Sequence, residues 1–115
     1  MPAVFAISLL CIGLIFGPIA NATPLSTVHP CAADALQRAE KLLALQTDAD
    51  ERGAISKKLV VLRPLRNPAN AKQKFDVLGV TGFVYKAEFR MRFIYAQIPE
   101  QCVLVGQEIL EYTGL

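Results

Sequence analysis

The stretch FVYKAEFRMRFIY, residues 83–95, carries the clearest structural pattern in the sequence. Its odd-numbered side chains are all apolar or aromatic, and its even-numbered positions include Lys86, Glu88, Arg90 and Arg92. Successive side chains of a β-strand point to opposite faces of the sheet. The alternation therefore predicts one long strand with a buried face and a solvent-facing face. By itself the pattern indicates no function.

The N-terminal part predicts export. Residues 3–16, AVFAISLLCIGLIF, are almost continuously apolar, and they are followed by Gly17-Pro18 and by Ala20-Asn21-Ala22. An apolar run, a helix breaker and a small-residue site are typical of a secretory signal peptide, here cleaved after Ala22. An uncleaved membrane anchor is the alternative, because residues 2–20 just reach the ~20 apolar residues that a membrane span needs. We expect an exported protein, periplasmic or secreted, with no stable membrane anchor after cleavage. The expected division is a signal peptide (1–22), an extended arm (23–31) and a single α+β domain (32–115).

Cleavage would leave two cysteines in the chain, Cys31 and Cys102. Because an exported chain meets an oxidising compartment, the simplest prediction is one disulfide between them. Two separate buried thiols are the alternative. The bridge would close a loop of roughly 70 residues, for which the chain-entropy model gives about 4 kcal/mol of stabilisation.

The remaining sequence predicts one helix and four strands. Residues 32–46, AADALQRAEKLLALQ, place Ala and Leu on one stripe at helical spacing. Short connections between the strands favour antiparallel neighbours. The expected fold class is therefore α+β, with one N-terminal helix packed on a four-stranded antiparallel meander. The predicted strands are residues 55–62, 75–80, 83–95 and 102–112, with a tight turn at Thr81-Gly82.

A helix followed by a four-stranded antiparallel meander resembles cystatin-like folds in outline. The cystatin inhibitors use an N-terminal glycine and a Q-x-V-x-G hairpin loop. In this chain no glycine lies between Thr23 and Arg52, and Val105-Gly106-Gln107 does not match the loop motif. The resemblance implies topology only, and no site residue is taken from it.

The last predicted strand implies a second apolar face of the sheet. If Cys102 points at the helix, Leu104, Leu110 and Tyr112 point inward with it, and the intervening apolar residues point outward. Such an outer face is covered by a second layer, removed by a β-bulge at Gly106, or used for docking. The docking hypothesis predicts a partner face built from Val84, Ile94, Val103, Val105 and Ile109, ringed by Lys86, Arg90 and Arg92.

The segment from Lys57 to Arg92 is strongly basic. It contains nine basic and two acidic residues, a net charge of +7, although the whole chain carries only +2. Two interpretations remain open: a surface for an anionic ligand, or an ordinary solvated face that acidic residues neutralise in the folded chain. The second is favoured, because folding can interleave charges that are separated in sequence.

The sequence shows no constellation for catalysis or for a cofactor. The single histidine, His29, lies in the predicted arm, where nothing is expected to orient it for a catalytic triad. A zinc site needs three or four ligands, and one histidine with two bridged cysteines does not supply them. The aromatic side chains of residues 83–95 fall on the face that the helix should cover, which argues against base stacking. We expect no enzymatic activity, no cofactor, no metal and no nucleic-acid binding.

Two classes of function fit these expectations. The first is an exported binding or assembly module, whose outer sheet face receives an unknown protein partner or a second copy, with the basic segment as a site for an anionic ligand. The second is a secreted inhibitor of a hydrolase that acts through its hairpin loops around Thr81-Gly82 and residues 98–101.

Overall fold

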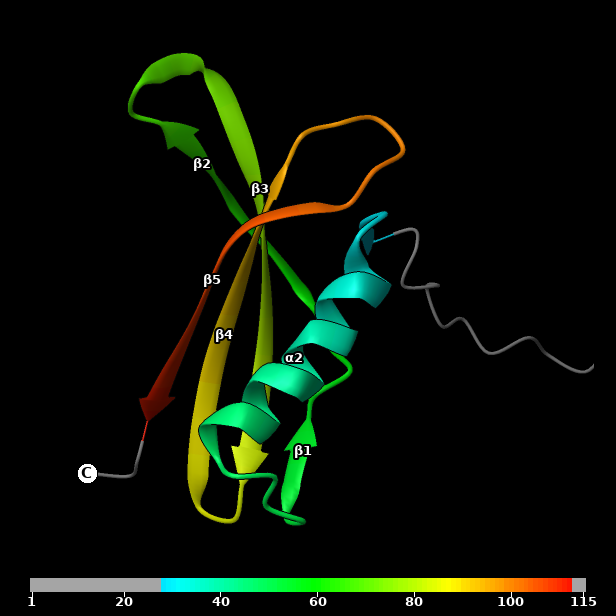
Figure 1. The fold of residues 1–115 in the computed structure, drawn as a ribbon, viewed down its shortest axis with the longest axis vertical. Coiled ribbons are helices and arrows are strands. Elements are labelled where there is room, and N and C mark those ends of the chain that lie inside the picture. Colours follow the sequence, from blue (N-terminus) through cyan, green and yellow to red (C-terminus); the bar gives the residue numbers. More distant parts are fainter. Residues whose placement is uncertain (1–27, 113–115) are drawn as a thin grey trace, which may run out of the picture.

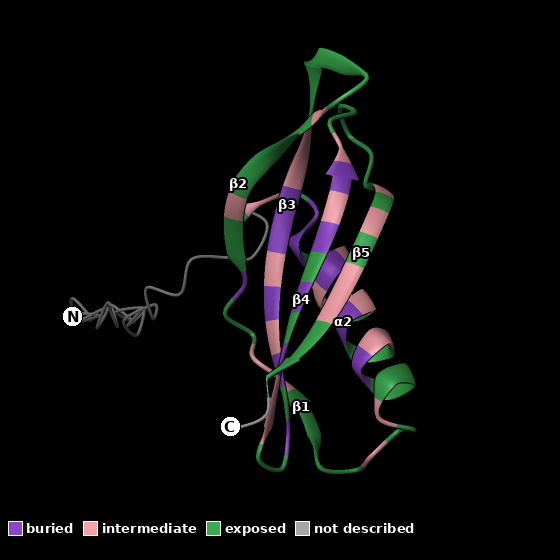
Figure 2. Ribbon diagram, turned by 90° about the vertical axis from the view of Figure 1, so that its left-hand side faces the viewer, coloured by how far each residue is buried: buried purple, intermediate pink, exposed green. Residues whose placement is uncertain are grey.

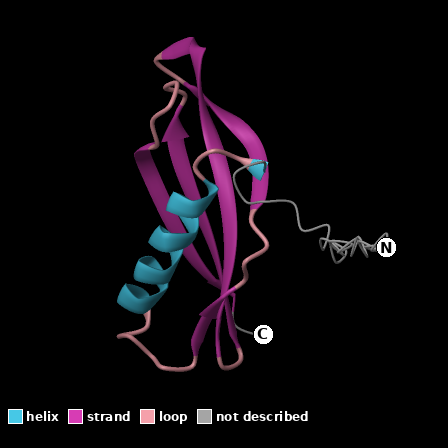
Figure 3. Cartoon of the chain, turned by 90° about the vertical axis from the view of Figure 1, so that its right-hand side faces the viewer, coloured by secondary structure: helices cyan, strands magenta, loops and turns pink. Residues whose placement is uncertain are grey.

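The structure, a computed structural model, describes residues 28–112. The predicted signal peptide and most of the predicted arm lie outside the described residues. One helix packs across one face of an antiparallel sheet, so the α+β class is confirmed (Figures 1 and 3). The elements are α2 (Ala32–Gln46), β1 (Gly53–Ile55), β2 (Val60–Asn67), β3 (Asn70–Val84), β4 (Ala87–Ala96) and β5 (Val103–Tyr112).

The sheet has five strands where four were predicted, because its first edge strand is interrupted. The strand order is β1-β3-β4-β5, and β2 also pairs with β3. Ile55 of β1 lies opposite Gly82, and Val60 of β2 lies opposite Gly79. β1 and β2 are therefore two pieces of one edge, separated by residues 56–59. Apart from this break, the strands follow one another as the predicted meander.

The prediction of a single strand over residues 83–95 is wrong. β3 continues through Thr81 and Gly82 and ends at Val84, and β4 begins at Ala87. The predicted turn at Thr81-Gly82 is wrong for the same reason, since both residues pair with β4 inside the ladder. The actual turn is Tyr85-Lys86, with Tyr85 at a φ of 55°. It contains none of the Gly, Asn or Asp residues that usually mark a two-residue hairpin turn, so the sequence carried no signal for it.

The core lies between α2 and the two central strands, β3 and β4. Figure 2 shows buried residues alternating with more exposed ones along both strands. Three alanines of the helix have no exposed surface, and their small side chains let α2 lie close to the sheet. Gly82 permits the same approach from the other side, because a Cβ there would come within 3.1 Å of Leu43 Cδ2 and Met91 Cε. The main core residues are Ala32, Ala35, Ala39 and Leu43 of the helix, and Leu78, Val80, Val84, Phe89, Met91, Phe93 and Tyr95 of the sheet.

A disulfide and a side-chain hydrogen bond connect the helix to the sheet. The predicted disulfide between Cys31 and Cys102 is confirmed, with a Cα–Cα distance of 5.6 Å and a sequence separation of 71 residues. Farther along the helix, Asp34 accepts hydrogen bonds from the Tyr95 hydroxyl and from Arg38 Nε, each at 2.7 Å. Partial burial raises the pKa of Asp34, but these two hydrogen bonds outweigh it and the net pKa is lowered.

Candidate functional site

The face of the sheet that α2 does not cover, here called the outer face, is the candidate site. In β4 the buried residues Phe89, Met91, Phe93 and Tyr95 face the helix. The residues between them face the opposite way, because side chains alternate along a strand. On β4, three residues of the predicted partner face therefore lie on the outer face: Arg90, Arg92 and Ile94.

Two predicted members of that face lie on the wrong side of the sheet. Val84 is 8% exposed and belongs to the same core cluster as Leu43, because the chain turns directly after it. Ile109 lies opposite Met91 and packs against the same core. Lys86 belongs to neither face, since it lies in the β3–β4 turn, where its Nζ is 5.4 Å from the centroid of the Tyr85 ring.

A β-bulge in β5 explains the error at Ile109. Tyr95 lies opposite Leu104, whereas Ile94 lies opposite Gly106, so Val105 is an extra residue on β5. The bulge predicted near Gly106 as one alternative is thus present, and it reverses the alternation of side chains after it. Before the bulge, Leu104 packs against the core as predicted, and Val103, opposite Ala96, lies on the outer face with Ile94.

After the bulge, the prediction that Leu110 and Tyr112 point inward is wrong. Leu110 lies opposite Arg90 and Tyr112 opposite Glu88, so both share the outer face with the charged residues of β4. Leu110 is 51% exposed and Tyr112 is 44% exposed. The bulge therefore moves apolar surface from the core side to the outer face.

The outer face has a partly covered apolar centre and an open hollow beside it. Val77, only 1% exposed, pairs with Leu62 on one side and Ile94 on the other. The hollow has a volume of about 490 Å³. Its lining residues on β2, β3, β4 and β5 include Val60, Leu62, Gly79, Thr81, Arg90, Arg92, Glu108, Leu110 and Tyr112.

Val60, Leu62 and Leu110 also belong to this face, although they were not among its predicted members. The signal for the first two was the run Leu59–Leu62, whose uninterrupted apolar character fits a strand with both faces partly covered. Nothing in the sequence indicated that Leu110 faces outward, because its orientation depends on the bulge.

The charges of the outer face are paired with one another. Arg92 forms an ion pair and hydrogen bond with Glu108 on the neighbouring strand. That hydrogen bond lowers the pKa of the Glu108 carboxyl. Arg90 Nε lies 3.6 Å from Glu88 Oε1. The Arg90 guanidinium carbon lies 4.4 Å from the centroid of the Tyr112 ring. The predicted positive rim is therefore a rim of mixed sign.

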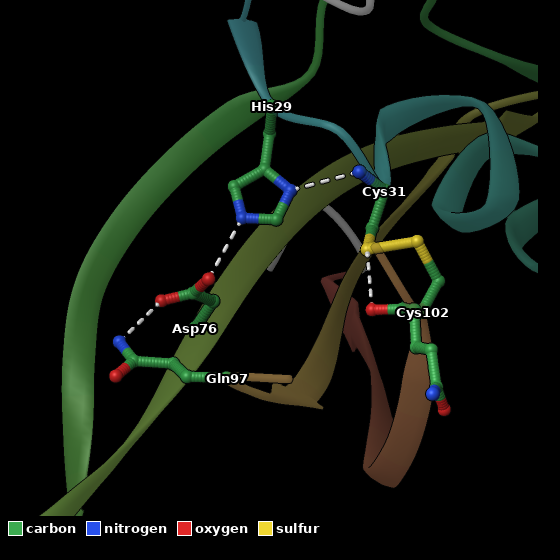
Figure 4. A network of polar contacts seen from close by, with 6 residues as sticks. His29, Cys31, Asp76, Gln97 and Cys102 are labelled. Atoms are coloured by element: carbon green, nitrogen blue, oxygen red, sulfur yellow. Dashed lines mark hydrogen bonds and ion pairs between the residues drawn. A yellow bond between two sulfur atoms is a disulfide. The ribbon is translucent and has the colours of Figure 1, made fainter. Parts of the chain in front are cut away.

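A second polar cluster joins the start of the described chain to the sheet (Figure 4). His29 Nδ1 accepts a hydrogen bond of 3.0 Å from the Cys31 backbone N–H, which leaves Nε2 of the neutral ring to donate to Asp76 Oδ2 at 2.9 Å. Gln97 donates to the other Asp76 oxygen at 2.8 Å. Partial burial raises the pKa of Asp76, but the hydrogen bonds from Gln97 and His29 lower it by more. Both ring nitrogens thus serve to hold the chain beside the disulfide.

Within residues 28–112, no group of three or more His, Cys, Asp and Glu side chains is arranged to hold a metal ion. The only helix bounded in that part of the chain, α2, is too short and too polar to cross a membrane. No protein-family model, no curated protein and no solved structure matches this chain.

Proposed function

We propose that this protein is an exported, non-catalytic binding module that self-associates through its outer sheet face. The observation that carries the proposal is the half-exposed apolar surface of Val60, Leu110 and Tyr112 on the side of the sheet opposite α2. Antiparallel sheets commonly leave one face to solvent, but that face is then polar. An apolar face is instead typical of an interaction surface.

The shape and the charges of the face favour a second copy of the chain as its occupant. The hollow is open and spread over four strands, so it offers a broad surface rather than an enclosed pocket for a small molecule. Arg90 and Arg92 are balanced by Glu88 and Glu108. A partner should therefore present an apolar centre with both signs of charge around it, and the face itself meets that description. In a two-fold dimer the same patch is used on both subunits.

Sedimentation velocity over a wide range of protein concentrations tests this proposal. The wild-type protein should convert from monomer to dimer as concentration rises, and Val60→Glu and Leu110→Glu should stay monomeric. Leu45→Glu is the matched control, because Leu45 is 78% exposed but lies on α2. Thermal melting of each variant separates loss of association from loss of folding. A wild-type protein that remains monomeric throughout would overturn the proposal.

Export remains part of the proposal. The signal peptide predicted over residues 1–22 would deliver the chain to an oxidising compartment, and a Cys31–Cys102 disulfide is the kind of bond that persists there. N-terminal sequencing of the protein recovered from the exported fraction tests this part. A first residue of Thr23 is expected, and an intact Met1 would contradict it.

Inhibition of a hydrolase is the second candidate, and one loop favours it. The sequence predicted two inhibitory loops, one around Thr81-Gly82 and one at residues 98–101. Thr81-Gly82 lies within β3 and forms no loop, so only the loop between β4 and β5 remains. Cys102 ties this loop to Cys31, and Ile98 is 41% exposed on it. Rigid, exposed loops suit inhibitors, because pre-ordered loops lose little entropy on binding. The cystatin-like outline remains a prediction about topology. Inhibition of a purified hydrolase that Ile98→Ala abolishes would favour this candidate over the first.

A further inference from the structure

The hairpin made by the end of β2 and the start of β3 extends past the rest of the sheet (Figure 1). The last pair between β3 and β4 is Phe75 with Ala96, so residues 70–74 pair with β2 alone. We call residues 63–74 the basic arm. All of its residues are exposed except Asn67, which is partly exposed. The basic arm therefore adds almost nothing to the core.

The charges of the basic arm have one sign. The arm contains Arg63, Arg66, Lys72 and Lys74 and no acidic residue. None of these four side chains forms an ion pair with any residue in the described range 28–112. The other cations of the sheet differ, since Arg90 and Arg92 each have an acidic neighbour.

Two of the cations oppose each other directly. Arg66 and Lys74 are register partners across the arm. Like charges at such positions destabilise a pair of strands. A local arrangement that works against stability is expected mainly where function requires it. The missing negative charge would then come from a ligand.

We propose that the basic arm binds the anionic headgroups of a lipid bilayer. Four cations on one projecting hairpin can each contact a headgroup, and the attraction increases with each added Lys or Arg. Leu65 is 39% exposed, and Pro68-Ala69 forms the turn, so the arm also offers small apolar groups to the bilayer interface. The arm has no aromatic residue, which leaves it without a platform for stacking nucleic-acid bases. This site is separate from the outer face and does not depend on self-association.

Vesicle co-sedimentation of the protein recovered from the exported fraction tests the proposal. Vesicles with a large share of phosphatidylglycerol should bind the protein, and pure phosphatidylcholine vesicles should bind it far less. Lys72→Gln/Lys74→Gln should weaken partitioning into the anionic vesicles roughly thirtyfold, since each cation near an anionic surface contributes a factor of roughly five. The matched control is Lys41→Gln/Lys86→Gln, which removes the same charge from α2 and from the β3–β4 turn. It should change partitioning only slightly.

Three results would overturn the proposal. Equal losses in both double variants would assign the binding to the overall charge of the protein. Equal binding to the two vesicle types would assign it to apolar insertion. Binding of duplex DNA that needs Lys72 and Lys74, without binding of vesicles, would make the basic arm a nucleic-acid site.

Discussion

On the helix side of the sheet Phe93 and Tyr95 have no exposed surface, whereas on the outer face Leu110 exposes 51% and Val60 exposes 48%. Both faces are rich in apolar side chains, but α2, the disulfide and the Asp34–Tyr95 hydrogen bond close only the first. The apolar residues of the helix side are explained by the stability they provide. The half-exposed residues of the outer face, such as Val60 and Leu110, gain little from their partial burial, so their presence needs a different reason. Self-association supplies one.

Removal of the disulfide should cause the largest loss of stability, and this loss should fall on the helix side of the sheet alone. Cys31→Ala/Cys102→Ala opens a loop that spans 71 residues, and the free energy of unfolding should fall by about 4 kcal/mol. Because the bond ties α2 to the start of β5, folded protein that remains should still associate through the outer face. Urea unfolding with and without the bridge measures the loss. A loss below about 1 kcal/mol would mean that the bond does not restrain the unfolded chain as this model requires.

Matched truncations on the two faces should give the next largest difference. Leu78 has no exposed surface and packs in the core, so Leu78→Ala should cost about 3 kcal/mol in transfer free energy and cavity formation. Leu110→Ala removes the same atoms from the outer face and should cost less than about 0.5 kcal/mol in the monomer. Chemical denaturation at low protein concentration compares them. Similar losses for both would show that the outer face is part of the core.

A smaller loss of stability is expected when the hydrogen bond that links α2 to β4 is removed. Tyr95→Phe removes one of the two hydrogen bonds to Asp34 and should lower the free energy of unfolding at neutral pH by about 1 kcal/mol.

The pH dependence of that loss follows from the lowered pKa of Asp34. A carboxyl whose pKa is lower in the folded state stabilises the protein above its unfolded pKa of about 3.9, and it loses this contribution as pH falls through the folded pKa. The difference between wild type and Tyr95→Phe should therefore shrink below about pH 4. Urea unfolding at neutral pH and at about pH 3 measures it. A difference that stays constant would show that packing, rather than the charge on Asp34, sets the effect.

Much of the helix side could be predicted from the sequence because its signals are local. The helix at residues 32–46 follows from spacing and residue type, and its bounds agree with α2. The disulfide follows from the cysteine count once export is assumed. Pro64 lies in β2 at the edge of the sheet, a position that suits a residue with no backbone N–H to donate to a neighbouring strand.

The outer face could not be predicted in the same way, because two features of chain geometry decide which residues reach it. The Tyr85-Lys86 turn lacks the usual turn residues, so the alternation of residues 83–95 suggested one strand. The bulge at Val105 shifts the register by one position, and a one-residue shift moves every following side chain to the other face. Val84, Ile109, Leu110 and Tyr112 were placed on the wrong face for these two reasons.

The most direct test of the outer-face account is the rate at which a thiol reagent labels Leu110→Cys at low and at high protein concentration, with Leu45→Cys as the reference. Self-association through the outer face predicts that labelling at position 110 slows as concentration rises, while labelling at position 45 on α2 stays constant. If both positions are labelled at the same rates at every concentration, the outer face does not bind a second copy and the proposal is wrong.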